Sequence, residues 1–351
     1  MRKLSLPSLA LASLLLAPLA AHAHTPLGGL AVAVSPDGKT VVAGGDSRTL
    51  YVLDAGSLAV KSRVWVKTSI WALHFNKDGT KLIVEDTGPT LSVVDTGTWQ
   101  VERSEIKLGH LSPARQVDLG AALGQGSDGS PVIRVVSLGD LAEKAAIPFE
   151  KGQRVAAFGL NADGTRLAVF MEGTKDEGEP TAKSGDTPKE LRGAAAEEWK
   201  QRNDGKTAMF FEFEVPSGKK LAERKLFYTT GEARVFYAGG AVHAVSYSNV
   251  NARLAADGKV EIFQTANSFN YGHGISADQK VLLTGGLRDG SYTAVEGLRT
   301  AKFQADKLPG WPEYWKSFAI HSDGTAYGTT TAYRIVKIKP DGSIEKAAPV
   351  H

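Results

Sequence analysis

The sequence predicts an all-β fold, a seven-bladed β-propeller built from four-stranded antiparallel blades. Three observations lead to this prediction: one turn recurs along the chain, its spacing is regular, and each repeat holds four short strand-like runs. The turn follows a short apolar run each time, and its copies are Ser35-Pro36-Asp37-Gly38, Asn76-Lys77-Asp78-Gly79, Asn161-Ala162-Asp163-Gly164, Ser276-Ala277-Asp278-Gln279 and His321-Ser322-Asp323-Gly324.

The spacing of these turns sets the size of the repeat. Asp37 and Asp78 are 41 residues apart, Asp78 and Asp163 are 85 apart, and Asp278 and Asp323 are 45 apart. A period of about 40 to 45 residues lies in the range of propeller blades. The interval between Asp163 and Asp278 is 115 residues, which indicates two repeats and an insertion of roughly 31 residues at that period.

Each repeat is expected to form one blade. In the first repeat, runs rich in Val, Leu, Tyr and Thr predict strands at 30–35, 40–43, 49–53 and 59–66. A four-stranded blade cannot bury both faces alone, so blades stacked around an axis bury each face on a neighbour. We expect one domain over 24–351, with blades at about 28–66, 69–108, 110–149, 153–226, 229–265, 268–306 and 309–348.

Two repeats depart from the pattern. The third has Asp118-Leu119-Gly120 where the others have an Asp-Gly turn, and the fifth has Gly239-Gly240 at its first turn and Asp257-Gly258 at its last. The alternatives are another all-β fold, such as a solenoid or two sandwiches, and a propeller of six or eight blades.

The N-terminal segment predicts export. Arg2 and Lys3 precede an apolar run over 4–20, and Ala21-His22-Ala23 places small residues at the expected cleavage site. This order is typical of a secretory signal peptide over 1–23, so a periplasmic or secreted protein is expected. Cleavage after Ala23 would leave His24 as the mature N-terminus, where the amine and imidazole can chelate copper, although a frayed and unimportant end is the simpler interpretation.

The amino-acid composition argues against several classes of partner and cofactor. The chain has 41 basic and 38 acidic residues, a balance that gives no electrostatic argument for nucleic acid. No later stretch is apolar and long enough to cross a bilayer. Without a cysteine the chain has no disulfide, no thiolate metal site and no covalently attached c-type haem. No cofactor and no metal site are therefore expected.

Two segments carry a family resemblance. Leu50-Tyr51-Val52-Leu53-Asp54-Ala55-Gly56-Ser57-Leu58-Ala59-Val60 and Leu91-Ser92-Val93-Val94-Asp95-Thr96-Gly97-Thr98-Trp99-Gln100-Val101 resemble the strand pair of YVTN-type propeller repeats. The Ser-Pro-Asp-Gly-Lys turn also resembles theirs and the WD40-like turn. The resemblance implies a propeller in an exported setting. It implies no single activity, because relatives include scaffolds, binding proteins, lactonases and redox-enzyme subunits.

The insertion is expected in the fourth blade, over about 172–206. Its first part, 172–185, is polar and predicts a loop. Thr187-Pro188-Lys189-Glu190 then has the form of a helix N-terminus. A helix over 187–203 would place Leu191, Ala195 and Trp199 on one stripe. We expect Trp199 to anchor the helix to the propeller rim; docking of a partner, or a lid, is the alternative.

The candidate binding site is one mouth of the central channel, where the chain enters the first strand of each blade. These segments are rich in aromatic and basic residues, which suit an anionic or aromatic ligand. Trp71, in one of them, is expected to pack between blades. The predicted ligand-binding residues are Arg115, Arg154, Arg234, Tyr271, His273, Trp311, Trp315 and Lys316.

Other polar residues are expected to be structural. The turn aspartates cap their own turns, and no pair of histidines has metal-ligand spacing; His74, His273 and His321 are read as channel or turn residues. Two function classes follow. The first is a non-catalytic exported propeller that binds a protein partner or a small anionic or aromatic ligand at the channel mouth. The second is an enzyme in the channel, either a lactone or ester hydrolase or a redox-enzyme subunit. No nucleophile–base motif is present, which favours the first.

Overall fold

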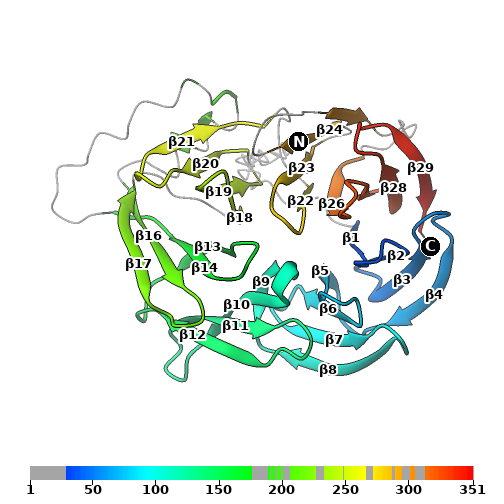
Figure 1. Ribbon diagram of the computed structural model, residues 1–351, viewed down its shortest axis with the longest axis horizontal. Helices are drawn as coiled ribbons and strands as arrows, with labels where there is room; N and C mark the ends of the chain where they lie inside the picture. The colour runs from blue at the N-terminus through cyan, green and yellow to red at the C-terminus, as the bar shows by residue number, and fades with distance from the viewer. Residues whose placement is uncertain are drawn as a thin grey trace, which may run out of the picture.

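Antiparallel β-sheet dominates the structure, which is a computed structural model. It describes residues 29–175, 189, 191–193, 196–197, 199–200, 206–226, 233–247, 249–265, 272–286, 289–294, 301–304 and 313–350. In this part of the chain the strands form seven antiparallel sheets, which surround a common axis (Figure 1). The signal-peptide prediction falls on residues 1–23, outside the described part.

The sheets follow one another along the chain and are numbered here in that order. Sheet 1 contains β1 (Leu30–Val34), β2 (Thr40–Gly45), β3 (Thr49–Asp54) and β4 (Val60–Trp65); sheet 2 contains β5 (Ile70–Phe75), β6 (Lys81–Asp86), β7 (Leu91–Asp95) and β8 (Gln100–Ile106). Sheet 3 contains β9 (Gly109–Ala114), β10 (Leu119–Gln125), β11 (Pro131–Ser137) and β12 (Glu143–Pro148).

Sheet 4 has a fifth short strand. It contains β13 (Val155–Leu160), β14 (Arg166–Met171), β16 (Lys206–Glu214) and β17 (Lys220–Leu226), and β15 (Thr174–Lys175) pairs with β16. Sheet 5 contains β18 (Ala233–Ala238), β19 (Ala241–Ser246), β20 (Asn251–Leu254) and β21 (Val260–Phe263). Sheet 6 contains β22 (Gly272–Ile275), β23 (Val281–Gly285), β24 (Asp289–Ala294) and β25 (Ala301–Gln304). Sheet 7 contains β26 (Trp315–Ile320), β27 (Ala326–Thr330), β28 (Arg334–Ile338) and β29 (Ile344–Pro349).

Burial changes from the inner to the outer strand of a sheet. All five residues of β1 are buried, because a neighbouring sheet covers each of its faces. The outer strand β4 instead alternates, with Lys61, Arg63 and Trp65 exposed and the residues between them half-buried. The sequence LAVAV of β1 is therefore apolar at every position, whereas VKSRVW of β4 is apolar only in part.

Hydrophobic clusters lie between sheets, and the last sheet shares one with the first. Leu30 and Leu53 of sheet 1 pack with Tyr327 and Ile335 of sheet 7. The Tyr327 hydroxyl also donates a hydrogen bond to the Ala55 carbonyl at 3.2 Å. Equivalent clusters join sheets 1 and 2, 2 and 3, 3 and 4, 4 and 5, 5 and 6, and 6 and 7. The all-β fold of a propeller type is thus confirmed.

The recurring aspartates hold their own turns. Asp37 Oδ1 accepts hydrogen bonds from Ser35 Oγ at 2.6 Å and from the Lys39 amide at 3.0 Å. These bonds, the Ser35 bond first, hold the pKa of Asp37 below its ordinary value. Asp163 accepts an equivalent pair from the hydroxyl and amide of Thr165. The third and fifth repeats, which lack the Asp-Gly turn, also turn the chain at this position. Gly239 and Gly240 have positive φ angles, and so does Asp118.

The insertion leaves and rejoins sheet 4 at paired residues. Lys175 of β15 lies opposite Lys206 of β16, close to the predicted limits of 172–206. Within the insertion, Leu191 and Trp199 are buried, and they belong to the cluster that joins sheets 4 and 5. Most of the predicted helix over 187–203 lies outside the described residues and stays a prediction. In the described part of the chain, no helix is long and apolar enough to span a membrane.

Gln279 replaces the turn glycine in sheet 6. Its φ is +57°, in the left-handed region, and only 4% of it is exposed. Its amide reaches two other sheets: Nε2 donates to the Leu160 carbonyl of sheet 4 at 2.7 Å, and Oε1 accepts from the Tyr237 amide of sheet 5 at 2.9 Å. A left-handed conformation costs a residue with a Cβ about 1 kcal/mol or more. The two hydrogen bonds, one buried and one partly buried, offset that cost.

We expect Gln279→Ala to lower the free energy of unfolding by about 2 kcal/mol, because the buried Leu160 carbonyl and the half-buried Tyr237 amide lose their partners. Gln279→Gly should lose about half as much, since glycine adopts the left-handed conformation without strain. Denaturant unfolding measures both, with the exposed Gln116→Ala as the control. Equal stability of the Ala variant and the parent chain would contradict this role.

Candidate functional site

Four basic residues belong to the first strands of their sheets or follow one directly, and these strands surround the axis in Figure 1. They are His74 of β5, Arg115 after β9, Arg234 of β18 and His273 of β22. Arg234 lies close enough to lower the pKa of each of the other three. These four residues, from sheets 2, 3, 5 and 6, are called the axial cluster below.

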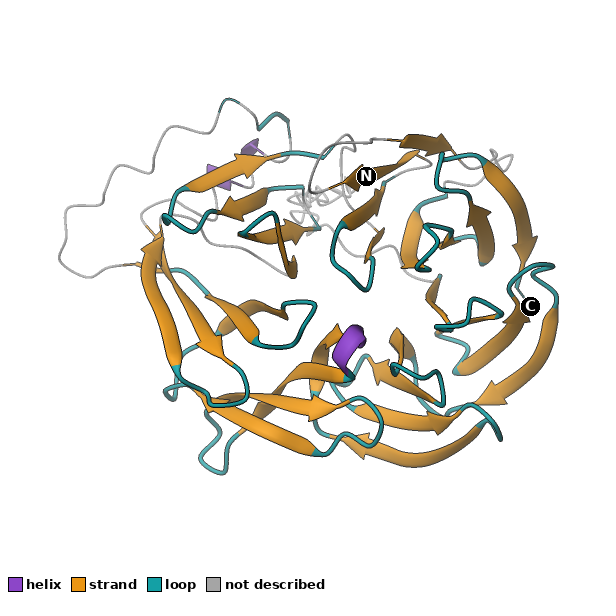
Figure 2. Ribbon diagram, viewed as in Figure 1, coloured by secondary structure: helices purple, strands orange, loops and turns teal. Residues whose placement is uncertain are grey.

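Arg115 extends across the ring. It begins the short 3-10 helix η1 (Arg115–Val117), beside the axis in Figure 2, which ends at Asp118 in the left-handed conformation. Its Nη2 donates a hydrogen bond to the Ile275 carbonyl at 3.0 Å, and thus joins sheet 3 to the end of β22 in sheet 6. Burial, and then Arg234, lower the pKa of Arg115 to about 10, so its guanidinium is charged at neutral pH.

His74 is a buried imidazole with an unsatisfied nitrogen. Only 8% of the residue is exposed, and Nε2 has no hydrogen-bond partner in the described part of the chain. Burial lowers its pKa well below the ordinary value, and Arg234 and then Arg115 lower it further. His74 is therefore neutral at pH 7. A buried polar atom without a partner costs stability, so the site is suited to a group that would bond it.

His273 is placed by the glycines on either side of it. A Cβ at Gly274 would lie 2.5 Å from the Phe318 carbonyl oxygen, and one at Gly272 would lie 3.1 Å from the Lys316 backbone. Both glycines therefore let β22 approach β26, and His273, between them in the strand, points the other way. Desolvation and the nearby Arg234 lower the pKa of His273 to about 3. It is half-buried, so solvent still reaches it.

The positive charge of the axial cluster has no acidic counterpart among the described residues. Of the ion pairs found there, none includes Arg115 or Arg234. Two guanidinium groups near one another in a partly dry environment repel, and an anion between them would reverse that effect. In the same part of the chain no group of three or more His, Cys, Asp or Glu residues is placed to hold a metal ion.

The structure places Arg115 differently from the prediction. Arg115 was expected where the chain enters its first strand, but β9 ends at Ala114, so Arg115 follows the strand instead. The prediction misplaced it because the third repeat lacks the Asp-Gly turn that marks the strand end elsewhere. The sequence pattern favours a structural role for His74, whereas the structure places it close to Arg234 and Arg115. The only signal for it was a histidine inside an otherwise apolar strand.

Two further residues of the predicted binding site, Trp315 and Arg154, lie outside the axial cluster. Trp315 is 1% exposed and packs against Phe318, with ring centroids 5.1 Å apart. Its ring occupies space left by Gly285 and Gly328, where a Cβ would approach it to 2.6 Å. Trp315 is therefore a core residue and not a wall of a pocket. Arg154 is 76% exposed and lies 3.8 Å from Glu172, so the structure does not bring it to Arg115 and Arg234.

Lys316 pairs with an aromatic ring at the end where the first strands begin. Its Nζ lies 5.2 Å from the centroid of Trp71, in sheet 2. The side chain passes over Gly29, where a Cβ would lie 3.1 Å from Lys316 Cγ, so only glycine leaves this route open. Trp71 is half-buried, and the ammonium group of Lys316 that contacts it comes from sheet 7, which is not adjacent to sheet 2. The two remaining predicted residues, Tyr271 and Trp311, lie outside the described residues.

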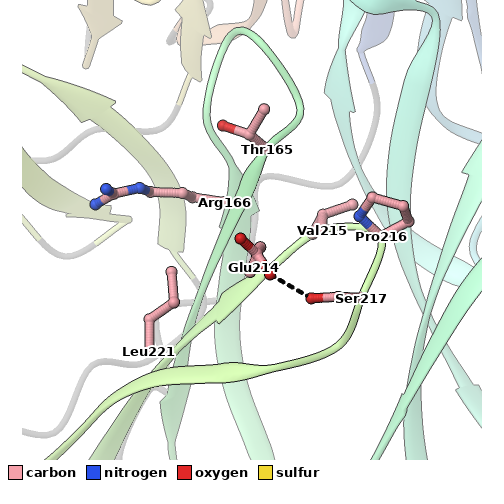
Figure 3. Close-up of a pocket in the computed structure, with 7 residues that line it drawn as sticks. All are labelled: Thr165, Arg166, Glu214, Val215, Pro216, Ser217 and Leu221. Atoms are coloured by element: carbon pink, nitrogen blue, oxygen red, sulfur yellow. Dashed lines mark hydrogen bonds between the residues drawn. The ribbon is translucent and has the colours of Figure 1, made fainter.

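A pocket lies on sheet 4, and no residue of the axial cluster lines it (Figure 3). It has a volume of about 380 Å³, and it is lined by Thr165, Arg166, Glu214, Val215, Pro216, Ser217 and Leu221. The Ser217 hydroxyl donates to Glu214 at 2.6 Å, so these two polar groups are already paired with one another. None of the predicted site residues lines it.

Comparisons with known proteins support the fold. No family model matches the chain, and no curated protein matches it in sequence. Many solved structures match it in fold. One is titled "Kuenenia stuttgartiensis Hydrazine Synthase": it has a TM-score of 0.56 and 15% sequence identity, and the match covers 92% of this chain and 96% of that chain. At this identity the likeness shows a shared propeller-type fold.

The low pKa of His273 predicts a pH dependence of stability. The unfolded chain binds a proton at this residue below about pH 6.5, whereas the folded chain binds it only near pH 3. Folding is therefore favoured above pH 6.5, and the free energy of unfolding falls as the pH is lowered between these values. The slope is at most about 1.4 kcal/mol per pH unit for this residue.

We expect His273→Asn to reduce this slope between pH 6.5 and 4.5. Denaturant unfolding at several pH values measures it. The control is Gln116→Ala, an exposed substitution that removes no titratable group, and its slope should equal that of the parent chain. Identical slopes in the His273 variant and the parent would show that this imidazole is not enclosed.

Proposed function

We propose that this chain is an exported seven-bladed β-propeller, related in repeat pattern to YVTN-type propellers, that binds a small anionic ligand in its central channel. In this proposal Arg115 and Arg234 hold the anion, with His74 and His273 beside it. The single observation that carries it is a pair of arginines around the axis with no carboxylate paired to either among the described residues.

The proposed blade count rests on packing. The described strands form seven sheets, and a hydrophobic cluster between sheets 7 and 1 accompanies those between all successive sheets. Such closure leaves no sheet with an uncovered face. The proposed export rests on the basic, apolar and small-residue order of residues 1–23.

Electrostatics favours a small anion over other ligands. Charges interact more strongly where protein atoms exclude water, and the lowered pKa values of His273 and Arg115 have desolvation as their main cause. Arg115, Arg234 and His273 are each half-buried, so solvent contact remains for an incoming ion. The exposed Arg154 is not part of this proposal.

The enzyme alternative has less support. The structural neighbour is titled a hydrazine synthase, but a shared fold does not carry a shared activity. A binding role uses only the charges and imidazoles of the axial cluster. We therefore propose the non-catalytic function as the best supported.

Isothermal titration calorimetry with inorganic phosphate, sulfate, citrate and acetate tests the proposal. We expect at least one of these anions to bind the exported chain, and Arg234→Gln to weaken that binding about tenfold or more, because a charged hydrogen-bond partner is lost. Arg154→Gln is the matched control and should bind like the parent chain. If no anion binds, or if both variants bind equally well, the proposed function is wrong.

Export has an independent test. Expressed with its own N-terminal segment in a bacterial host, the chain should reach the periplasm and begin at His24. Intact-mass measurement of the periplasmic fraction detects this cleavage. A full-length chain that remains in the cytoplasm would contradict the proposed signal peptide.

A further inference from the structure

The axial cluster offers a ligand hydrogen-bond acceptors as well as positive charge. Arginine has only donors, so Arg115 and Arg234 do not distinguish one oxyanion from another by hydrogen bonding. A neutral imidazole has one N–H donor and one nitrogen acceptor. Two such imidazoles beside two arginines therefore provide acceptors as well as donors.

Both imidazoles are neutral at pH 7. Burial and the two arginines lower the pKa of His74, and burial and Arg234 lower that of His273 to about 3. In the described part of the chain His74 Nε2 bonds no protein group, and the Ile275 carbonyl at the same end of the axis already accepts from Arg115. The acceptors left for a ligand in the cluster are thus imidazole nitrogens.

We infer that the anion held by the axial cluster is hydrogen phosphate, an oxyanion that keeps a hydroxyl group, and that His74 and His273 select it. This inference rests on the proposed function. The two arginines bind the negatively charged oxygens, and an imidazole nitrogen accepts the phosphate hydroxyl. The other imidazole donates its N–H to a further oxygen.

The inference separates three chemically similar anions. Inorganic phosphate carries at least one hydroxyl at neutral pH, whereas sulfate carries none and has acceptors only. A phosphomonoester loses its last acidic proton near pH 6, so at pH 7.5 it resembles sulfate in this respect. Only inorganic phosphate satisfies both kinds of group in the cluster at that pH.

Calorimetric titration at pH 7.5 with inorganic phosphate, sulfate and methyl phosphate, a monoester without any other hydroxyl, tests this. We expect phosphate to bind about tenfold or more tightly than sulfate and methyl phosphate, because a buried acceptor is unpaired with the latter two. Equal affinity for sulfate, or for methyl phosphate, would overturn the inference while leaving the proposed anion binding intact. Binding of none of the three would overturn both.

Substitution of each histidine tests whether it causes the preference for phosphate over sulfate. His74→Phe and His273→Phe keep a ring of similar shape without a hydrogen-bonding nitrogen, and each should lose most of the preference for phosphate. Sulfate affinity should be retained, which also shows that the variants fold. His74→Asn offers an amide donor and acceptor and should recover part of the preference.

A buried histidine elsewhere provides the control. His243 is 6% exposed and stacks on Phe236 with ring centroids 5.2 Å apart, and its Nε2 lies 3.3 Å from the Ala238 carbonyl oxygen. His243→Phe should leave the preference for phosphate unchanged. An unchanged preference in both His74→Phe and His273→Phe would overturn their role in selection.

Discussion

The structure depends on the inability of a four-stranded sheet to cover its own two faces. The inner strand β1 is apolar on both sides, and all five of its residues are buried by the sheets next to it. The packing of Leu30 and Leu53 against Ile335 of the last sheet is therefore as important as any contact within a sheet. Burial of apolar area of this kind is the dominant favourable contribution to folding.

This arrangement places residues far apart in sequence around one axis. Arg115 and Ile275 are separated by 160 positions and share a hydrogen bond, because sheets 3 and 6 face each other across the ring. Polar groups there are enclosed by several sheets at once, which explains why desolvation is the main cause of the low pKa of His273 and of Arg115. A ring with charged groups near its axis concentrates their field in a small volume.

Departures from the repeat occur where one sheet makes a contact that the others do not. Gln279 takes the place of a turn glycine and bonds sheets 4 and 5. Gly272 and Gly274 give β22 its close approach to sheet 7 and leave His273 directed away from it. Gly29 leaves a path for Lys316 to reach Trp71. In each case the local sequence looks irregular, and the reason lies in another sheet.

The sequence by itself determined the all-β fold class, the approximate bounds of the four strands of the first repeat and the structural role of the turn aspartates, because these follow from local periodicity and turn chemistry. It placed Arg115, Arg234 and His273 in segments that enter first strands, whereas in the structure Arg115 follows its first strand. Only the tertiary structure decided that Trp315 fills a core gap between Gly285 and Gly328, that Arg154 points to solvent, and that His74 lies beside two arginines. Those outcomes depend on how neighbouring sheets meet, and no pattern within one repeat contains that information.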